Sequence, residues 1–200
     1  MGKLKKVYCL MGYTAVGKST IAKKITQEIE DLHLAVSHTT RPIRPNEKEG
    51  IDYYFIDDKK FEKMNKNDCF IETRSYNTKI EVNGKTKDAT WNYGYSKEEF
   101  ENHKHCIAIV DVTGYEELKE YFEPKGVMVI PIYIRVKENI LKERVLKRGD
   151  LLAEFERRLE DDKKRFRKFR VNVLSKNIDN DTDDVQRAVD ELKVFICGDL

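Results

Sequence analysis

The sequence predicts an α/β fold, in which a doubly wound parallel sheet carries a small β-rich insert and a basic helical arm. Short apolar runs rich in β-branched residues alternate with amphipathic helical stretches along much of the chain. The region from Asp52 to about Ser96 instead alternates aromatic and polar residues, and Glu138 to Phe169 is helical and dense in Arg and Lys. We expect a single domain over 1–200, with a core at 1–36 and 98–200, an insert at about 37–97 and an arm at about 138–165.

The charge balance of the chain is nearly neutral. Charged residues make up 37% of the 200 residues, against ~25% in an average soluble chain. The 38 basic residues almost cancel the 36 acidic ones, so the net charge of +2 gives no global argument for binding nucleic acid or an anionic membrane. No apolar run approaches the ~20 residues that cross a bilayer, and Val7 to Met11 is too short for a signal peptide. We expect a cytoplasmic protein.

The cysteines and histidines predict neither a disulfide framework nor a zinc site. His103 and His105 form a His-x-His that could in principle grip a metal, but no carboxylate pair is near. A solvated entrance to a strand is the favoured interpretation. The cysteines are scattered without any Cys-x-x-Cys pair, so we expect free thiols at Cys9, Cys69, Cys106 and Cys197.

The first elements form a strand followed by a helix. Val7 to Met11 is a short apolar run that ends at a glycine, as a buried parallel strand should. From Lys18 onward, isoleucines recur every four residues, which predicts an amphipathic helix to about Leu32. Leu34 to Val36 is a second candidate strand, and the polar stretch with two prolines from Thr39 to Gly50 predicts a structured loop.

The insert is expected to contain a short helix near Lys59 to Asn65 and a β-hairpin. Asn83-Gly84 lies at the centre of the alternating stretch from Lys79 to Thr86. Asn-Gly between alternating runs is a strong hairpin signal, because a type I′ turn needs positive φ at both central positions.

The rest of the chain returns to the α/β pattern. Ile107 to Val112 and Val127 to Ile134 are β-branched runs separated by a helical stretch around Tyr115 to Tyr121. This spacing implies parallel strands joined by a right-handed crossover. After the basic arm, Val171 to Leu174 is a candidate last strand and Val185 to Ile196 a closing helix.

Residues Gly12 to Ser19 match the P-loop pattern GxxxxGK[ST], between a predicted strand and a predicted helix, which is the context that the motif needs. Its glycines let backbone N–H groups curl around phosphate oxygens, and the helix N-terminus adds partial positive charge. Lys18 should reach the β- and γ-phosphates and Ser19 should ligate Mg²⁺. A glycine-containing turn can match by chance, but strand, spacing and helix agree here. We therefore predict a P-loop NTPase fold that binds ATP through Gly12, Tyr13, Thr14, Ala15, Val16, Gly17, Lys18, Ser19 and Thr20.

A longer pattern follows the P-loop. The segment Ser37-His38-Thr39-Thr40-Arg41-Pro42-Ile43-Arg44, then Glu47, then Gly50-Ile51-Asp52-Tyr53 resembles the guanylate kinase pattern S-x-T-T-R-x-x-R-x-x-E-x-x-G-x-D-Y at every spacing. The resemblance covers nearly the whole chain and continues at 70–72, Tyr93-Gly94, 111–114, Arg144, Arg148-Gly149 and 157–159. It implies a nucleoside monophosphate kinase that uses MgATP and accepts GMP or dGMP.

The resemblance assigns the acceptor nucleotide to six positions: Arg41, Arg44, Tyr53 and Tyr93 for its phosphate, and Ser37 and Glu72 for its base. Two guanidiniums three residues apart in a Pro-containing loop can clamp a dianionic phosphate, and tyrosine hydroxyls can donate to the same oxygens. A carboxylate can accept from the N1–H and amino group of guanine, an edge that adenine lacks. Taken alone, Arg41 and Arg44 would more often be solvated loop charges and Tyr53 a core residue, but the joint spacing favours a site.

Asp111 ends the apolar run Ile107 to Val110, where a P-loop enzyme places an acidic residue near Mg²⁺ or the acceptor nucleotide. The family commonly shows Asp-x-Asp here, but position 109 is Ile, so metal handling is expected to rest more on Ser19 and water. A carboxylate at the end of a strand can also be only a helix N-cap.

The basic arm has two interpretations. Its Lys and Arg interleave with Glu and Asp, which is more typical of a salt-bridged, solvated helix than of a nucleic-acid site. The resemblance implies a mobile lid at about 138–165, whose arginines close over the triphosphate and neutralise charge during transfer. It also implies a contact between Asn180 and the adenine of ATP. The predicted catalytic residues are Lys18, Arg41, Arg144, Arg148 and Arg158.

Two features depart from the family. Ser or Thr usually follows the Tyr-Gly pair, but this chain has Tyr95 and then Ser96. Tyr95 either narrows the base pocket or points away while Ser96 supplies the hydroxyl. The chain between Glu72 and Tyr93 is also longer than the family's tight turn, and its hairpin either covers the site or projects into solvent.

Three functions are open on the sequence alone. The first is phosphorylation of GMP or dGMP by ATP in purine nucleotide metabolism, and the second is the same fold acting on another phosphorylated riboside. The third is a non-catalytic module that recognises phosphorylated protein partners, but such modules typically lose the P-loop lysine that this chain retains as Lys18. We predict the kinase, as a monomer or homodimer that binds small nucleotides and neither nucleic acid nor membrane.

Overall fold

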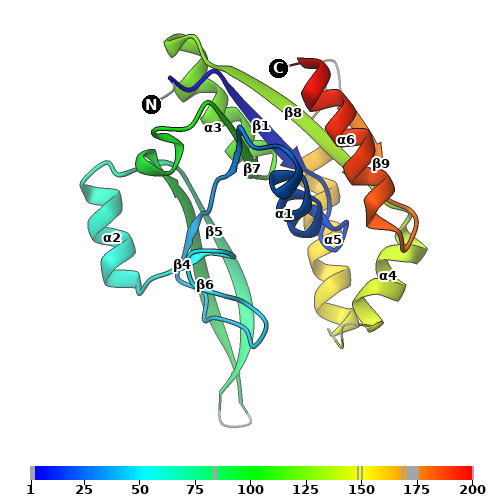
Figure 1. Cartoon of the computed structure of the whole chain (residues 1–200). Coiled ribbons are helices and arrows are strands. Elements are labelled where there is room, and N and C mark those ends of the chain that lie inside the picture. Colours follow the sequence, from blue (N-terminus) through cyan, green and yellow to red (C-terminus); the bar gives the residue numbers. More distant parts are fainter. Residues whose placement is uncertain are drawn as a thin grey trace. The chain divides into compact units, whose positions relative to one another are not determined.

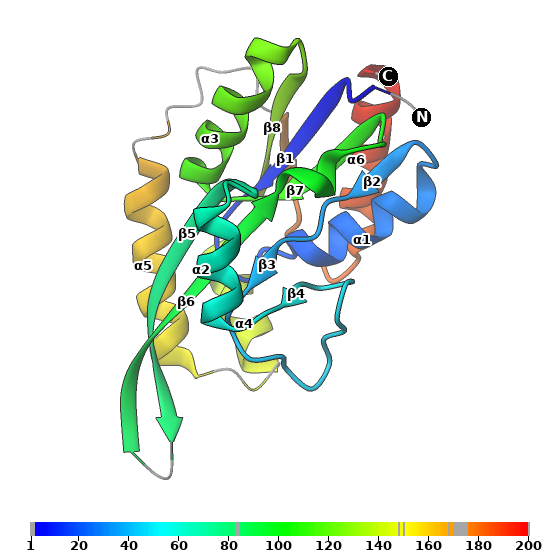
Figure 2. The same ribbon diagram turned by 90° about the vertical axis from the view of Figure 1, so that its left-hand side faces the viewer.

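The structure is a computed structural model that describes residues 3–82, 85–147, 149, 151–167, 169 and 176–199. It divides into two compact units, a first unit built from Met1–Leu34 with His103–Leu200 and a second unit, Ala35–Asn102. Figures 1 and 2 together label their α-helices and strands.

The elements of the first unit are β1 (Lys6–Met11), α1 (Lys18–Glu28), β2 (Leu32–Leu34), β7 (His105–Ile109), α3 (Val112–Phe122), η2 (Glu123–Lys125), β8 (Met128–Arg135), α4 (Glu138–Lys147), α5 (Leu152–Arg167), β9 (Lys176–Asp179) and α6 (Val185–Asp199). Those of the second unit are β3 (His38–Thr39), β4 (Tyr54–Phe55), α2 (Asp58–Lys66), β5 (Phe70–Val82), β6 (Lys85–Ser96) and η1 (Lys97–Phe100).

The strands of the first unit form a parallel sheet in the order β2-β7-β1-β8-β9. Strand β1 lies at the centre between β7 and β8, and every one of its residues is buried. Helices α1 and α6 pack side by side on one face, whereas α3 lies on the other (Figures 1 and 2). This doubly wound parallel α/β sheet confirms the predicted fold class.

The hydrophobic core of the first unit explains the apolar periodicity of helix α1 and of the central strands. Isoleucines at the predicted four-residue spacing, Ile21 and Ile25, are fully buried on the inner face of α1. They join the strand residues Leu10, Ile107 and Ile132 in one cluster. A buried helix face therefore meets a buried sheet face, which is the packing that these periodicities predict.

Two boundaries near the N-terminus differ from the prediction. Helix α1 ends at Glu28 rather than about Leu32, because Ile29 already has extended backbone angles and Leu32 starts β2. The predicted strand at 34–36 was placed two residues too late. Leu32 to Leu34 pair with β7, whereas the N–H of Val36 donates to Oε1 of Glu99 and so leaves the ladder.

The later elements match in kind, with shifted ends. The predicted runs 107–112 and 127–134 form β7 and β8, which lie parallel on either side of β1 rather than beside each other. The predicted continuous helix 138–169 is two helices, α4 and α5, and Gly149 between them has φ of +75°. The predicted strand 171–174 lies outside the described residues, and β9, which the sequence did not predict, follows it.

The second unit contains a mixed sheet in the order β4-β3-β6-β5. Strands β5 and β6 form a long antiparallel hairpin with paired residues from Phe70↔Ser96 to Val82↔Lys85. This confirms the predicted hairpin and the predicted helix near 59–65, which is α2. The Asn83-Gly84 turn signal itself lies outside the described residues.

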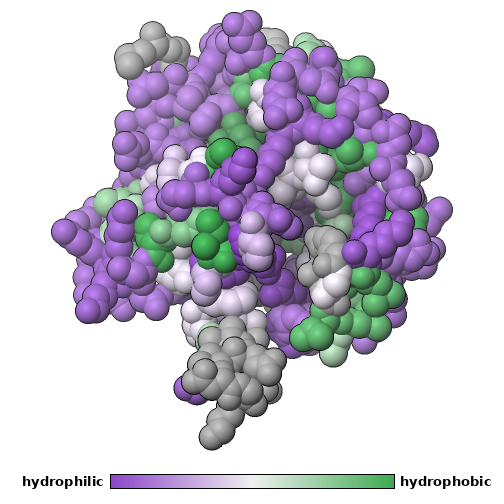
Figure 3. Space-filling view, turned by 60° about the horizontal axis from the view of Figure 1, so that its bottom comes forward, coloured by the Kyte–Doolittle hydropathy of each residue, from purple (hydrophilic) through white to green (hydrophobic). Residues whose placement is uncertain are grey.

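The molecular surface agrees with the high share of charged residues. Figure 3 shows a mainly hydrophilic face, with a hydrophobic patch at the lower right, on the side where Figure 1 draws α4. Exposed leucines near the connection between α4 and α5 are Leu146, Leu151 and Leu152. Within the described ranges, none of the helices combines the length and the apolar character that a membrane span requires.

The central sheet gives a test of stability. Ile132 of β8 is fully buried and is paired with Leu10 of β1 and Lys176 of β9. We expect Ile132→Ala to lower the free energy of unfolding by about 2–5 kcal/mol, because it leaves a cavity in the core. The measurement is urea unfolding followed by circular dichroism. Ile51→Ala removes the same atoms from a half-exposed side chain and should cost about 1 kcal/mol or less. Equal losses for the two variants would contradict this description of the core.

Candidate active site

The loop between β1 and α1 has a backbone that only glycine accommodates at two positions. Gly12 has φ of +145°, and a Cβ there would lie 2.5 Å from the carbonyl oxygen of Ile134. Gly17 has φ of +94°, and its Cβ would lie 2.8 Å from Nδ2 of Asn180. A side chain at either position would collide with its neighbours. The two P-loop glycines therefore let the loop pass tightly against β8 and the segment after β9.

The rest of the loop prepares the start of α1 for an anion. Ala15 adopts the left-handed region at φ of +63°, and Val16 is buried in the core. Gly17, at the N-cap, offers no side chain to cap the helix, and the first turn holds no acidic residue. The first N–H groups and the positive end of the helix dipole thus remain available for a phosphate, beside the exposed Ser19 and Thr20.

Lys18 folds back over the loop. Its ammonium group donates to the carbonyl oxygens of Gly12, at 2.7 Å, and Tyr13, at 2.9 Å. These neutral acceptors hold the charge beside the loop, where the sequence predicts that Lys18 meets the β- and γ-phosphates.

A carboxylate of α5 contacts the P-loop backbone. The N–H of Thr14 donates to Oδ2 of Asp162 at 2.7 Å. Burial raises the pKa of Asp162, although the hydrogen bond from Thr14 and the charges of Lys18 and Arg165 oppose this effect. A carboxylate, like a phosphate, offers negatively charged oxygens to a backbone N–H. Sequence reasoning missed Asp162, since 148 residues separate it from Thr14.

Aromatic packing also anchors α5 on the loop. The ring of Phe166 lies 5.5 Å from that of Tyr13 and 5.2 Å from that of Tyr133 in β8, measured between centroids. Phe155 and Leu159, from the same helix, are buried in the core of the first unit. The segment that the resemblance describes as a mobile lid is thus packed against the P-loop here, and its movement stays a prediction.

Asp111 caps α3. Its Oδ1 accepts a hydrogen bond from the N–H of Gly114 at 3.0 Å, and its Oδ2 lies 3.1 Å from NH1 of Arg165. The N-cap interpretation of Asp111 is therefore confirmed. A contact with metal or acceptor stays a prediction, and any such ligand would meet a carboxylate already paired with Arg165.

Asn180 contacts the P-loop, and Arg144 in turn contacts Asn180. The Nδ2 of Asn180 donates to the carbonyl oxygen of Val16 at 2.9 Å, and the residue is buried. Arg144 in turn donates through NH2 to the carbonyl oxygens of Asn180 and Thr182, each at 2.7 Å. Both side chains therefore have structural partners. The predicted contacts of Asn180 with adenine and of Arg144 with phosphate are not tested by these bonds.

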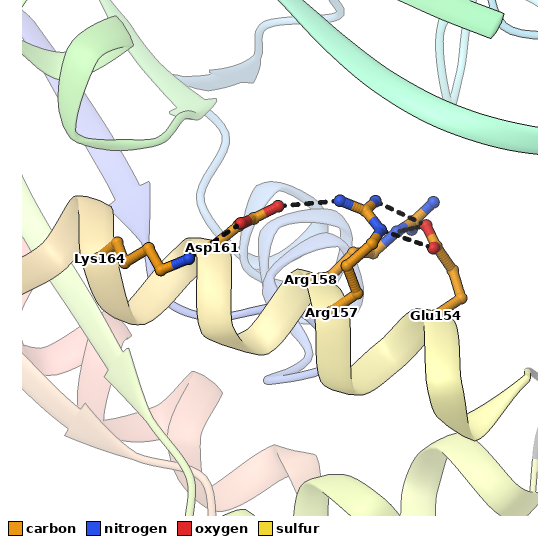
Figure 4. Close-up of polar contacts among 5 residues, drawn as sticks. All are labelled: Glu154, Arg157, Arg158, Asp161 and Lys164. Atoms are coloured by element: carbon orange, nitrogen blue, oxygen red, sulfur yellow. Dashed lines mark hydrogen bonds and ion pairs between the residues drawn. The ribbon is translucent and has the colours of Figure 1, made fainter. Parts of the chain in front are cut away.

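Arg158 belongs to a salt-bridge network along α5 (Figure 4). Arg157 and Arg158 both donate to the carboxylate of Glu154, and Arg157 also bridges to Asp161. The hydrogen bonds from Arg157, with help from Arg158 and against the effect of burial, lower the pKa of Glu154 to about 2. This supports the interpretation of the arm as a salt-bridged helix. Arg148, the remaining predicted lid arginine, lies outside the described residues.

The described residues show no protein-built metal cage. His103 stacks flat on His33, with ring centroids 3.6 Å apart. No group of three or more His, Cys, Asp or Glu side chains comes together within the described ranges. None of the four cysteines, all of which are described, forms a disulfide.

In the second unit, Arg41 is a buried and well-fixed cation. Its NH2 forms a 2.7 Å ion pair with Oε1 of Glu47, and its NH1 donates to the carbonyl oxygen of Pro42 at 2.8 Å. The guanidinium also lies 5.2 Å from the ring centroid of Tyr53 and 5.7 Å from that of Phe55. Charge pairing and cation–π contacts thus hold one orientation of Arg41.

Glu47 organises both arginines of the acceptor motif. Its Oε2 accepts from the backbone N–H of Arg44 at 2.9 Å, while the side chain of Arg44 is exposed. Burial disfavours charge on Arg41 and Glu47. Burial is the largest single effect on each pKa, but the mutual hydrogen bond, the backbone N–H of Arg44 and the nearby charges together outweigh it, which raises the pKa of Arg41 and lowers that of Glu47. The pair is therefore ionised at neutral pH.

The two predicted tyrosines lie near this pair. The rings of Tyr53 and Tyr93 meet edge to face, with centroids 5.8 Å apart. Burial raises the pKa of Tyr53, so its hydroxyl remains protonated and able to donate at neutral pH. Ser37, the third residue of this unit, is also buried. The second unit thus brings together the residues that the sequence assigned to an acceptor phosphate.

Glu72 is buried and already paired. Its Oε2 lies 2.8 Å from Nε of Arg74, and its Oε1 accepts from NH2 of Arg74 and from the backbone N–H of Tyr95, each at 3.2 Å. Sequence reasoning missed Arg74, although it lies two residues from Glu72 on the same face of a strand. The ring of Tyr95 is almost completely buried and packs against Phe100. This position in the core supports a structural role for Tyr95.

Comparisons with known proteins identify the family of this chain. The sequence model of the family described as guanylate kinase matches residues 4–197. The chain belongs to the guanylate kinase family. It is 31% identical over 195 residues to the guanylate kinase of Oceanobacillus iheyensis, covering 95% of this chain and 85% of that protein. It is 30% identical over 200 residues to the guanylate kinase of Caldanaerobacter subterraneus, with the same coverage of both.

A solved structure shows the same fold as this guanylate kinase family member. The crystal structure of guanylate kinase from Anaplasma phagocytophilum superposes with a TM-score of 0.62, covering 99% of this chain and 87% of that one. Its 23% sequence identity makes this a comparison of folds. The doubly wound sheet with its P-loop is therefore the family's architecture.

The contact between Asp162 and Thr14 predicts a measurable effect on nucleotide affinity. Asp162→Asn keeps the length of the side chain but removes the negative charge, which would repel the phosphates of a bound nucleotide. We expect the Kd for ATP to fall by about three- to tenfold, which corresponds to about 1 kcal/mol of lost repulsion. Isothermal titration calorimetry measures it. Asp161→Asn, on the same helix but paired with Arg157, is the control and should leave the Kd unchanged. Unchanged or weaker ATP binding by Asp162→Asn would refute the expectation.

Proposed function

We propose that this chain transfers the γ-phosphoryl group of ATP to GMP, producing ADP and GDP. The observation that carries the proposal is the buried Arg41, which Glu47 and Tyr53 hold in place in a chain that also has a P-loop. A P-loop supplies a site for the donor triphosphate, and a fixed, buried guanidinium supplies one for a second phosphate. Membership of the guanylate kinase family supports both assignments.

ATP would bind to the first unit. The backbone N–H groups of the loop and of the first turn of α1 would hold its phosphates, with Lys18 leaving its two carbonyl partners for the β- and γ-phosphates. Family members move phosphoryl groups between nucleotides, a reaction that generally uses Mg²⁺. The residues present fit this ion, because Mg²⁺ usually keeps several waters, and in P-loop enzymes the hydroxyl that follows the lysine helps to hold it. Ser19 offers such a hydroxyl and is exposed. When bound, Mg²⁺ would neutralise charge on the phosphates.

GMP would bind to the second unit. Arg41 and Arg44, with the hydroxyls of Tyr53 and Tyr93, would hold its phosphate and orient an oxygen for attack on the γ-phosphorus of ATP. Glu47 would keep Arg41 in its orientation. The base would be read by Ser37 and Glu72.

The arginines of α4 and α5 would complete the site by neutralising charge on the transferring group. Arg144 and Arg158 are held by backbone carbonyls and by Glu154, so their use in catalysis requires these partners to be exchanged for phosphate oxygens. We propose that the segment at about 138–165, which includes Arg148, acts as the lid that makes this exchange. The same proposal includes a contact between Asn180 and the adenine of ATP, and a contact between Asp111 and the metal or the acceptor.

A nucleotide screen tests the proposed function directly. Purified protein with MgATP and each nucleoside monophosphate in turn should form ADP with GMP and dGMP at rates far above those with AMP, CMP or UMP. The assay couples ADP formation to NADH oxidation. If none of the monophosphates supports ADP formation, the proposal is refuted. Equal rates with all of them would refute GMP as the preferred acceptor.

The P-loop lysine gives a prediction for the chemical step. We expect Lys18→Ala to lower kcat by about 100-fold or more, because a cation aimed at the transferring phosphate is lost, while the fold remains intact. Steady-state rates and a thermal unfolding curve measure the two effects. Lys24→Ala, on the same helix with its ammonium on Gln186, is the control and should retain activity. Near-normal turnover by Lys18→Ala would show that the P-loop assignment is wrong.

The buried arginine gives a prediction for the acceptor side. We expect Arg41→Ala to raise the KM for GMP by about tenfold or more and to lower kcat, with a much smaller effect on the KM for ATP. Arg41→Lys, which keeps the charge but not the fork, should fall between the wild type and Arg41→Ala. Arg187→Ala removes an exposed arginine of α6 and serves as the control. Equal loss of affinity for ATP and GMP would mean that Arg41 serves the donor.

A further inference from the structure

A buried ion pair occupies the position assigned to base reading. The side chain of Glu72 is fully buried and that of Arg74 is only 12% exposed. Arg74 faces both carboxylate oxygens, with Nε 2.8 Å from Oε2 and NH2 3.2 Å from Oε1. The N–H of Tyr95 adds a third donor, to Oε1. A base that donates to both oxygens of Glu72 must therefore share them with Arg74 or displace it.

The surroundings of Arg74 are those of the proposed acceptor site. In the β5–β6 hairpin Arg74 pairs directly with Tyr93, so their side chains leave the same face of the sheet as neighbours. Tyr93 in turn meets Tyr53 edge to face. The positive charge of Arg74 is close enough to Tyr53 to act against the burial that raises the pKa of this tyrosine. Arg74 thus lies between the residue assigned to the base and those assigned to the phosphate.

The chemistry of the pair matches one edge of one class of base. A 6-oxopurine presents an acceptor, O6, next to a donor, N1–H, and guanine adds the 2-amino donor beside it. An arginine and a glutamate side by side present donors next to acceptors. Adenine reverses this order, with a 6-amino donor next to the N1 acceptor, and would set donor against donor at Arg74.

We infer that Arg74 is a specificity-determining residue that donates to O6 of the acceptor base, while Glu72 accepts from N1–H and the 2-amino group. The inference rests on the proposed function. On binding, N1–H replaces one of the contacts between Arg74 and Glu72, and the N–H of Arg74 released in this way meets O6. No charge is left without a partner at any stage, which keeps the exchange from incurring the large cost of an isolated buried ion.

Three acceptors separate this role from its alternatives. GMP carries O6, N1–H and the 2-amino group. In 6-thio-GMP a sulfur, which is a weak acceptor, replaces O6, and IMP lacks only the 2-amino group. The quantities compared are the kcat/KM ratios of GMP to 6-thio-GMP and of GMP to IMP, measured with MgATP for the full-length chain.

For Arg74→Ala we expect the ratio of GMP to 6-thio-GMP to fall by about tenfold, because the hydrogen bond to O6 is lost. The ratio of GMP to IMP should change by about twofold or less, since the 2-amino group is read by Glu72. Lys87→Ala removes one exposed positive charge from the same hairpin and should leave both ratios and the rates unchanged.

Arg74→Lys is the control for the possibility that Arg74→Ala fails to fold. It keeps a positive partner for Glu72 but not the fork, so we expect a protein that unfolds at nearly the wild-type temperature, with an intermediate ratio of GMP to 6-thio-GMP. If Arg74 only positions Glu72, both variants lower activity on GMP and 6-thio-GMP equally, and the unchanged ratio overturns the inference. Rates that do not respond to either variant also overturn it. A wild type without activity on any purine monophosphate instead refutes the proposed function, and the inference falls with it.

Discussion

All strands of the sheet in the first unit run in the same direction, and this constraint decides where the chemistry of that unit can lie. Parallel strands share one edge for their carboxyl ends, so whatever follows each strand comes together there. Gly12 follows β1, Asp111 comes just after β7, and Asn180 follows β9. Residues far apart in the sequence thereby surround one loop. The buried apolar core holds the strands in this register, so the geometry of the loop depends on packing that contains no catalytic group.

Four charged side chains at or beside the proposed nucleotide sites share a second property, which is that each has a partner within the protein. Lys18 is held by backbone carbonyls, Asp162 accepts from the loop, Arg41 pairs with Glu47, and Glu72 pairs with Arg74. Buried charge without a partner is costly, so a site for charged ligands needs such internal substitutes. Binding then becomes an exchange of partners, in which the affinity measures the difference between two sets of contacts. The internal partners reduce the net binding energy, but they keep the side chains of the site in position.

The range over which each sequence signal acts explains which features could be predicted and which could not. The P-loop, α1 and the β5–β6 hairpin rest on spacings within one segment, and they were predicted. The misplaced start of β2 and the missed β9 depend on which residues pair with β7 and β8, which no local pattern contains. Asp162 could not be found because its partner is 148 residues away. Arg74 and the break at Gly149 did carry local signals, a same-face position beside Glu72 and a glycine within a helical run, but the family pattern contains no residue at the first position and the charge density of the arm predicts one continuous helix.

The bond between Asn180 and Val16 has a consequence for how the protein is made. It joins residues 164 positions apart, so the carbonyl of Val16 finds its side-chain partner only after most of the chain has been synthesised. Helix α1 likewise packs on α6, which leaves the ribosome long after α1 does. Contacts between such distant segments form slowly, because a long loop must close before they are rewarded. The nascent chain therefore completes this part of the P-loop surroundings only after β9 and α6 have been synthesised, and a truncated product that lacks β9 and α6 would carry an intact P-loop sequence without the residues that pack against it.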